Sequence, residues 1–298
     1  MLKILAWVVS NDSRFFNGAL NILERQHNGV EVVGVTASVP IHLVKDGKKV
    51  NFIPLAEVDG GGDYDLILVV GGKNTGANDI IRYARHLNLN IDKIIFDWIV
   101  CIPGFTLEKY RRLQRSRLSI FSINCFGGHM SHTLGLPFRS PLVNSFFKEK
   151  DYLRFLRAPY LYLEEDLIFK EMNIDPNTKT DYPVFTLGNI DVHFNHYDKM
   201  DEAKFNERKK KINRYNLFVE MYTEDKKILE QFDALPYGKK VCFVPFKSDL
   251  DSAWYVNPNF IKGKAFWEIV HDYSRGIYFY YDPFDMLLYG KKTQLIDM

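Results

Sequence analysis

Two short and uninterrupted apolar runs, residues 5–9 and residues 66–70, constrain the fold of this chain more than any other feature. Each run has the length of one β-strand and carries no polar residue, which is typical of a strand buried on both faces. Between them, residues 15–26 place apolar side chains at helical spacing, and residues 30–35 form a further strand-like run. Strands that alternate with helices predict a parallel sheet, so the amino-terminal part is expected to be a Rossmann-like α/β domain.

Three further elements are expected in this amino-terminal domain. An Asp-Gly pair at residues 46–47 lies between two strand-like runs and signals a hairpin. Residues 79–87 predict a helix, and residues 94–96 predict a last short strand. The domain is therefore expected to span residues 1–105.

The chain changes character after a Pro-Gly pair at residues 103–104. Residues 106–117 predict a basic linker helix with Thr106 as its cap. Residues 118–123 alternate apolar and polar side chains, as a half-buried strand does. Beyond them no βαβ pattern repeats, and Phe, Tyr, Lys and Asp become frequent. We therefore expect a mixed α+β domain over residues 118–298, which holds the candidate catalytic site.

Composition limits the classes of function that the chain can serve. With 298 residues, 46% hydrophobic and 26% charged, it is long and apolar enough to bury a sizeable core. The net charge of +2 gives no reason to expect a nucleic-acid partner.

The cysteines and the apolar runs indicate the compartment. The three cysteines, Cys101, Cys125 and Cys242, are widely spaced and form no Cys-x-x-Cys pair, which argues against a disulfide framework and a zinc ribbon. The amino terminus shows no secretory signal, and no run approaches the roughly 20 apolar residues that cross a bilayer. We therefore expect a cytoplasmic protein without a membrane span.

The leading candidate for a chemical site follows the strand at residues 118–123. There Asn124, Cys125, Phe126, Gly127 and Gly128 succeed one another. A cysteine at a strand-to-turn junction can be exposed, and the glycine amides that follow can face an oxyanion. Cys125 is thus the candidate nucleophile, while Asn124 and the amides of Gly127 and Gly128 are the candidate oxyanion donors.

A nucleophilic cysteine also needs a base, and two histidines are available near residue 195. The alternation of residues 190–195 predicts a strand with Asp191 and His193 on one face. In a Cys-His centre, His196 or His193 would be the base and Asp191 would orient it.

Two other interpretations of these residues stay open. Asp191, His193 and His196 could join Glu164 or Glu165 as zinc ligands, although a strand points residue 196 away from residues 191 and 193. Alternatively, Cys125 is a small buried residue and the histidines are satisfied in a polar core, since free cysteine is among the most buried residue types.

Cations and amides that could hold an anionic group lie elsewhere in the second domain. Arg139 follows a Pro-containing loop, and Arg208 and Asn213 lie at the end of a Lys-rich helix. Arginine binds carboxylate or phosphate with a fork of donors, although a surface salt bridge is the simpler explanation of Arg139 taken alone. We expect Arg139, Arg208 and Asn213 to bind substrate.

The amino-terminal domain has a weaker candidate for nucleotide binding. Gly71, Gly72 and Lys73 follow a buried strand and precede a helix, which suits a phosphate. They do not form the phosphate-loop pattern, and the first turn of the domain lacks the Gly-x-Gly-x-x-Gly of dinucleotide-binding proteins. In strand order the domain is similar to the small Rossmann-like domains attached to bacterial sugar-modifying enzymes, which take a sugar nucleotide.

Several motifs of the second domain occur in a fixed order, at residues 122–128, 134–141, 191–197 and 208–218. Over about residues 117–250 they resemble a bacterial family of unknown function whose members are often labelled exopolysaccharide or capsule biosynthesis proteins. The resemblance implies a cytosolic step on a sugar, a sugar nucleotide or a lipid-linked intermediate.

These observations favour a transferase-type enzyme that acts on a sugar or sugar-nucleotide precursor of exopolysaccharide biosynthesis. The alternative is a non-catalytic module that binds a sugar nucleotide or a partner of the assembly machinery. A third hypothesis is a nucleotide-dependent enzyme that uses the turn at Gly71. The sequence indicates neither a cofactor nor an oligomeric state.

Overall fold

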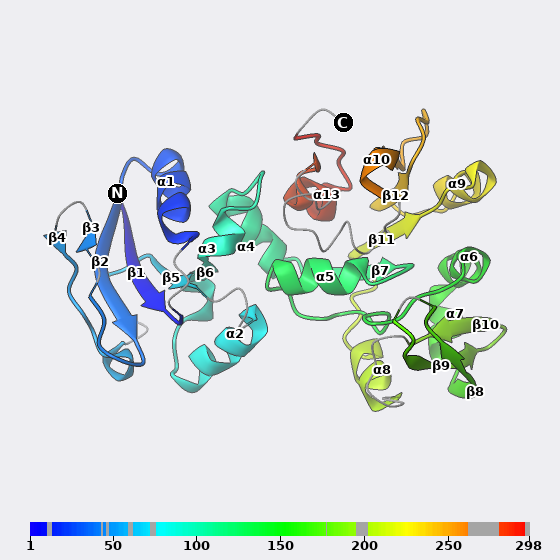
Figure 1. Ribbon diagram of the computed structural model, residues 1–298, viewed down its shortest axis with the longest axis horizontal. Coiled ribbons are helices and arrows are strands. Elements are labelled where there is room, and N and C mark those ends of the chain that lie inside the picture. Colours follow the sequence, from blue (N-terminus) through cyan, green and yellow to red (C-terminus); the bar gives the residue numbers. More distant parts are fainter. Residues whose placement is uncertain are drawn as a thin grey trace. The chain divides into compact units, whose positions relative to one another are not determined.

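The computed structural model describes residues 1–10, 14–42, 44–45, 48–58, 62–71, 76–176, 178–194, 202–261 and 280–295 (Figure 1). It divides into two compact units. Unit 1 contains Met1–Arg112 and His132–Pro137, and unit 2 contains Leu113–Ser131 and Phe138–Met298. Helices and strands of both kinds of pairing occur, so the expected α/β fold class is confirmed.

Unit 1 is built on the parallel sheet that the apolar runs predict. Its strands lie in the order β2-β1-β5-β6, and every neighbouring pair is parallel. All five residues of β5 and all three of β6 are buried, which explains why these runs contain no polar side chain. The strands are β1 (Leu2–Val8), β2 (Val30–Ala37), β5 (Leu66–Val70) and β6 (Ile94–Phe96).

Helices and short elements complete unit 1. The expected hairpin is present as β3 (Val44–Lys45) paired with β4 (Lys48–Lys49), while Asp46 and Gly47 themselves lie outside the described residues. The remaining elements are α1 (Phe16–Gln26), η1 (Leu55–Glu57), α2 (Ala77–His86), η2 (Ile91–Lys93) and α3 (Asp97–Val100).

The helix α4 (Leu107–Arg115) begins in unit 1 and ends in unit 2. The Thr106 hydroxyl accepts a hydrogen bond from the Lys109 amide at 3.1 Å, so Thr106 caps this helix as its sequence predicts.

Unit 2 contains a second parallel sheet, which the sequence pattern did not reveal. Its strands lie in the order β13-β12-β11-β7, all parallel. A separate antiparallel sheet and several helices are inserted between β7 and β11, so the strand–helix alternation is interrupted along the chain. The strands are β7 (Ser119–Ser122), β11 (Leu217–Tyr222), β12 (Lys240–Val244) and β13 (Ala253–Tyr255).

The first strand of this sheet differs from its expected half-buried form, because all four residues of β7 are buried. Its alternation comes from serines whose hydroxyls are satisfied inside the protein. Ser119 Oγ accepts a hydrogen bond from the Asn213 amide at 2.9 Å, and Ser122 Oγ accepts one from the Gly127 amide at 3.0 Å. A buried hydroxyl is tolerated when it is hydrogen-bonded, so alternation here does not report a solvated face.

The inserted antiparallel sheet has the order β10-β9-β8. Its strands are β8 (Leu167–Ile174), β9 (Asp181–Leu187) and β10 (Ile190–His193), so the strand predicted around residue 191 is confirmed as far as His193. The helices of unit 2 are α5 (Phe126–Thr133), α6 (Glu149–Arg157), α7 (Pro159–Glu164), α8 (Glu202–Lys209), α9 (Lys226–Asp233), α10 (Pro258–Ile261) and α13 (Pro283–Tyr289).

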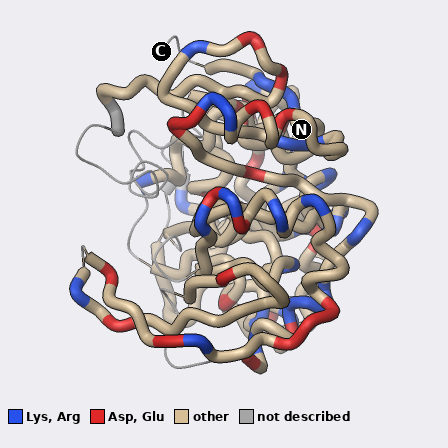
Figure 2. Tube along the Cα trace, turned by 90° about the vertical axis from the view of Figure 1, so that its right-hand side faces the viewer, with Lys and Arg blue, Asp and Glu red and all other residues tan. Residues whose placement is uncertain are grey.

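An aromatic core holds unit 2 together. Phe121 of β7 and Phe155 of α6 meet edge to face with their ring centroids 5.4 Å apart, and Phe147 joins Phe155 at 5.6 Å. Such rings bury large apolar areas and prefer these offset geometries. Positions of Lys and Arg and positions of Asp and Glu are both scattered along the described trace (Figure 2). No helix within the described ranges is long and apolar enough to cross a membrane.

Candidate functional site

The candidate site lies where β7 of unit 2 ends and α5 begins. Between them Asn124 and Cys125 form a turn that is held by its own hydrogen bonds. The Ser122 hydroxyl donates to the Asn124 carbonyl oxygen at 2.7 Å, and Asn124 Oδ1 accepts from the Phe126 amide at 2.9 Å. Ser122 Oγ also accepts from the Gly127 amide at 3.0 Å. The Gly127 amide and the Asn124 side-chain oxygen are therefore already engaged within the turn.

The two glycines of the motif allow α5 to approach β7 closely. A Cβ atom on Gly127 would lie 2.8 Å from Ser122 Oγ and 2.9 Å from Ile120 Cγ2. A Cβ atom on Gly128 would lie 3.2 Å from Val143 Cγ1. Side chains cannot approach so closely, so packing alone accounts for a glycine at position 127.

Glu220 is the unusual residue of this region. It lies in β11, directly opposite Ser122 of β7 in the parallel register. Two residues before it, Phe218 stacks on Phe126 of α5 with 6.3 Å between ring centroids, so this face of β11 is the one that α5 covers. The side chain of Glu220 therefore lies beneath the turn that contains Cys125.

The carboxyl group of Glu220 is buried without a described partner. The residue is 0% exposed, and neither carboxyl oxygen makes a hydrogen bond within the described part of the chain. Burial raises its pKa well above the ordinary 4.5. The Ile123 amide, which donates to the Glu220 backbone carbonyl oxygen at 3.2 Å, lies near the carboxyl group and opposes this rise only in part. The protonated, neutral form of the Glu220 carboxyl group is therefore favoured. Buried polar groups without partners are rare, and they occur at functional sites more often than elsewhere.

Cys125 is also buried, and its environment does not favour a thiolate. Burial raises the pKa of the Cys125 thiol to about 11, and the nearby Glu220 carboxyl adds to the effect. A nucleophilic cysteine requires the opposite environment, with a lowered pKa. In this arrangement Cys125 lines the site as a protonated thiol.

Tyr152 of α6 is a second buried polar group in the same unit. Its hydroxyl has no hydrogen-bond partner among the described residues. Burial raises its pKa well above 10.0, and Glu220 is the largest further contribution. The core of unit 2 near β11 thus contains two buried acids, Glu220 and Tyr152, whose pKa values are raised and whose side-chain oxygens have no described hydrogen-bond partner.

The predicted base does not form a hydrogen-bonded pair with Cys125. His193 is buried, and neither ring nitrogen has a partner among the described residues. Its ring stacks on Phe146 at 4.5 Å between centroids, and the two residues exchange backbone hydrogen bonds of 2.8 and 3.0 Å. Burial lowers the pKa of His193, with Lys148 adding to the effect, so a neutral imidazole is favoured. His196 lies outside the described residues.

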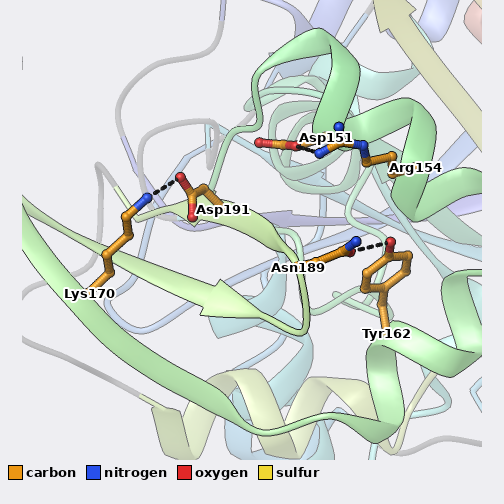
Figure 3. Close-up of polar contacts among 6 residues, drawn as sticks. All are labelled: Asp151, Arg154, Tyr162, Lys170, Asn189 and Asp191. Atoms are coloured by element: carbon orange, nitrogen blue, oxygen red, sulfur yellow. Dashed lines mark hydrogen bonds and ion pairs between the residues drawn. The ribbon is translucent and has the colours of Figure 1, made fainter.

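The predicted orienting residue, Asp191, binds a lysine instead. Its carboxylate lies 2.6 Å from Lys170 Nζ of β8, on the other side of β9 in the same sheet (Figure 3). Figure 3 also shows the Tyr162 hydroxyl donating to Asn189 Oδ1 at 2.7 Å, close to the turn between β9 and β10. Among the described residues, no group of three His, Cys, Asp or Glu side chains could hold a metal ion.

The predicted anion-binding residues lie in three different settings. Arg139 is half-buried, and its pKa is lowered by burial and by the charge of Arg117. Arg208 lies over the ring of Phe138 at 5.3 Å, and its Nη1 donates to the Val143 carbonyl oxygen at 3.2 Å. Asn213 accepts the Tyr215 amide at 3.2 Å before β11 begins. Asn213 therefore shapes the turn at the amino end of β11, whereas Glu220 is near the carboxyl end.

The weaker candidate in unit 1 is described only in part. The Gly71 amide donates to Asp97 Oδ2 at 3.2 Å, and Asp97 is fully buried. A carboxylate already occupies this amide and would repel a phosphate there. Gly72 and Lys73 lie outside the described residues.

Glu220 was not among the site residues predicted from the sequence, although the residue pattern around it is unusual. Glu220 is the one charged residue in the run Leu217–Tyr222, which is otherwise apolar or aromatic. A carboxylate in such a strand is costly to bury, and it occurs there mainly when it has a partner or a function.

Two comparisons with known proteins identify similar sequences. A family model described as "Domain of unknown function (DUF1919)" matches residues 100–290. An uncharacterized protein of Haemophilus influenzae is 33% identical over 182 residues, which are 59% of this chain and 84% of that protein. The resemblance to a family of unknown function is thus confirmed for the second part of the chain. Neither description mentions exopolysaccharide biosynthesis.

Proposed function

The chain belongs to the family described as Domain of unknown function (DUF1919), and from this premise we propose that unit 2 is a transferase-type enzyme. Its substrate would be a sugar or sugar-nucleotide precursor of exopolysaccharide biosynthesis in the cytoplasm. The sugar class rests on the resemblance of the ordered motifs between residues 122 and 218. The enzymatic part rests on the environment of Glu220.

The position of Glu220 is the observation that carries this proposal. In open α/β sheets, ligands bind outside the carboxyl ends of the parallel strands. Glu220 and Ser122 are the carboxyl-end residues that pair between β11 and β7, and the Cys125 turn covers them. A substrate at this edge must displace the turn to reach the carboxyl group of Glu220.

The raised pKa of Glu220 determines the role that we assign to it. A carboxyl group that keeps its proton at neutral pH can donate that proton to a leaving-group oxygen. Glu220 would therefore act as the general acid, and Cys125 would line the site with a neutral thiol. Arg139 and Arg208 would hold the anionic group of the substrate, as guanidinium groups do for phosphates.

The experiment compares Glu220→Gln with the exposed control Glu230→Gln. Purified full-length protein is titrated with UDP-glucose and UDP-N-acetylglucosamine by calorimetry, and transfer to sugar acceptors is followed by mass spectrometry. We expect Glu220→Gln to bind a nucleotide sugar as wild type does and to lose at least about 100-fold in transfer rate, which is typical for removal of a general acid. Equal transfer rates in Glu220→Gln and wild type would refute the role of Glu220.

The alternative is a non-catalytic binding module, and one observation favours it. The turn at Asn124 is closed by its own hydrogen bonds, and Cys125 beside it is a protonated thiol. A binding module would bind a nucleotide sugar in the same titration and yield no product with any acceptor. If the protein binds neither nucleotide sugar, the proposed substrate class is wrong for the transferase and for the binding module alike.

A further inference from the structure

The strand β8 is an exposed edge with an apolar face. It is an outer strand of the β10-β9-β8 sheet, and every residue after Leu167 is exposed to solvent. Four of its large apolar side chains are largely exposed, namely Ile168 at 65%, Phe169 at 45%, Met172 at 55% and Ile174 at 59%. An exposed apolar edge strand is a template for pairing with another strand.

A bulge in β8 places three of these four side chains, those of Phe169, Met172 and Ile174, on one face. Opposite β9, Phe169 pairs with Phe185 and Glu171 pairs with Val184, so Lys170 is an extra residue. One extra residue shifts the alternation of side chains by one position. Residues Leu167, Phe169, Met172 and Ile174 consequently pair with Leu187, Phe185, Pro183 and Asp181, which all share one face of β9.

The opposite face of β8 carries the charges. Lys170 and Glu171 lie together at the bulge, and Lys170 Nζ is 2.6 Å from Asp191 on the same sheet (Figure 3). Asp191 pairs with Thr186 of β9, and Thr186 pairs with Ile168 of β8, so the lysine is on the face that Ile168 shares. A positive and a negative side chain are thus adjacent at the centre of the strand.

We propose that β8 pairs antiparallel with β8 of a second copy of this chain, about a two-fold axis between Lys170 and Glu171. In that register each Lys170 lies beside Glu171 of the other copy, which gives two ion pairs. Phe169 then lies opposite Met172, and Leu167 lies opposite Ile174, on the apolar face. Side chains that are directly opposite in a sheet lie on the same face, and the bulge is what satisfies this condition for the register.

The charges identify the occupant as a second copy. A two-fold axis makes each surface patch meet itself, so a patch must be self-complementary to pair in this way. The sequence of β8 meets that requirement at its centre, where Lys170 meets Glu171, and on its apolar face, where Phe169 meets Met172 and Leu167 meets Ile174. On the other face, Ile168 meets Asn173. An unrelated strand would not require this symmetry.

The experiment reverses one charge at a time. Sedimentation velocity of the full-length protein gives the dimer dissociation constant for wild type, Lys170→Glu and Glu171→Lys. Each single variant places like charges opposite each other twice, and we expect each to weaken the dimer by about 10-fold or more. An equimolar mixture of the two variants restores both ion pairs, so its dimer should return to within about threefold of wild type.

Two controls separate this pairing from other effects. Asp191→Asn removes the ion pair within one copy and should leave the dimer unchanged, as should Lys150→Glu, which makes the same charge change at an exposed position of α6. A wild-type protein that is monomeric at all concentrations would overturn the proposal. So would a dimer that neither reversal weakens, or a mixture of the two variants that stays as weak as either one alone.

Discussion

Glu220 of β11 lies directly opposite Ser122 of β7, and a helix that starts with Phe126 covers both. Ser122 is fully engaged, since its hydroxyl donates to Asn124 and accepts from Gly127. Its neighbour across the sheet has no described hydrogen bond through either carboxyl oxygen. Of these two adjacent buried polar residues, Ser122 has hydrogen-bond partners for its hydroxyl group, and Glu220 has none described for its carboxyl oxygens. Glu220 is therefore the better indicator of function.

The first prediction concerns the dependence of stability on pH. The pKa of Glu220 is raised in the native protein above its ordinary value of 4.5, so the native state keeps a proton that the unfolded chain releases. Above about pH 4.5, the contribution of Glu220 to stability should therefore fall by about 1.4 kcal/mol per pH unit until the native pKa is reached. Glu220→Gln, which stays neutral, should remove this part of the slope.

Urea unfolding of wild type and Glu220→Gln between about pH 5 and about pH 8 measures the effect. The exposed Glu230→Gln variant is the control and should retain the wild-type slope. If wild type and Glu220→Gln lose stability in parallel as the pH rises, Glu220 is ionised in the native state and its proposed role as a proton donor fails.

The second prediction concerns the reactivity of Cys125. Burial raises its pKa to about 11, so at pH 7.5 its thiolate fraction is far below that of a free cysteine, whose pKa is about 8.5. Alkylation by iodoacetamide should be about 100-fold slower than for free cysteine. Mass spectrometry of peptides after a short exposure measures this, with urea-unfolded protein as the fully reactive reference. Rapid labelling of Cys125 in the native protein would instead restore it as a candidate nucleophile.

The helices and strands that the sequence predicted correctly are those whose residue pattern lies within one short stretch of the chain. The parallel sheet of unit 1 follows from continuous apolar runs, and the cap at Thr106 follows from a hydroxyl before a helix. The parallel sheet of unit 2 was missed because β7 and β11 are separated by a whole antiparallel sheet. Pairing between such distant strands leaves no periodic signal in either one.

The sequence predicted the candidate site from the types of residue in it, and residue type does not show whether a side chain is buried or which groups surround it. The segment around Cys125 does end a parallel strand, where ligands commonly bind. Whether the thiol is activated depends on burial and on Glu220, which lies far away in the sequence. Gly127 is ambiguous in the same way. A glycine that leaves its amide available to a ligand and a glycine that allows a helix to pack closely look identical in the sequence.

The third prediction tests the packing role of Gly127. In Gly127→Ala the new Cβ would lie 2.8 Å from Ser122 Oγ and 2.9 Å from Ile120 Cγ2, so either α5 or β7 must shift. Overpacking of this kind costs about 1–3 kcal/mol in the free energy of unfolding. Gly238→Ala is the matched control, since nothing lies within 4 Å of its Cβ position. Urea unfolding that shows equal stability for both variants would contradict the close contact between α5 and β7.

The fourth prediction concerns His193, whose pKa is lowered by burial, with a further contribution from Lys148. In the unfolded chain His193 binds a proton near pH 6.5, whereas in the native state it binds one only at lower pH. The contribution of His193 to stability should therefore fall as the pH drops below about 6.5. His193→Phe keeps the stacking on Phe146 and cannot titrate, so it should remove this acid-side loss. The exposed His86→Gln variant serves as the control.

Urea unfolding at about pH 5 and about pH 7 measures both variants. A loss of stability at acid pH that persists in His193→Phe would show that another group causes it. The contribution of His193 falls toward low pH and that of Glu220 falls toward high pH, and the two oppose each other between about pH 4.5 and about pH 6.5. The two variants should therefore move the pH of maximum stability in opposite directions.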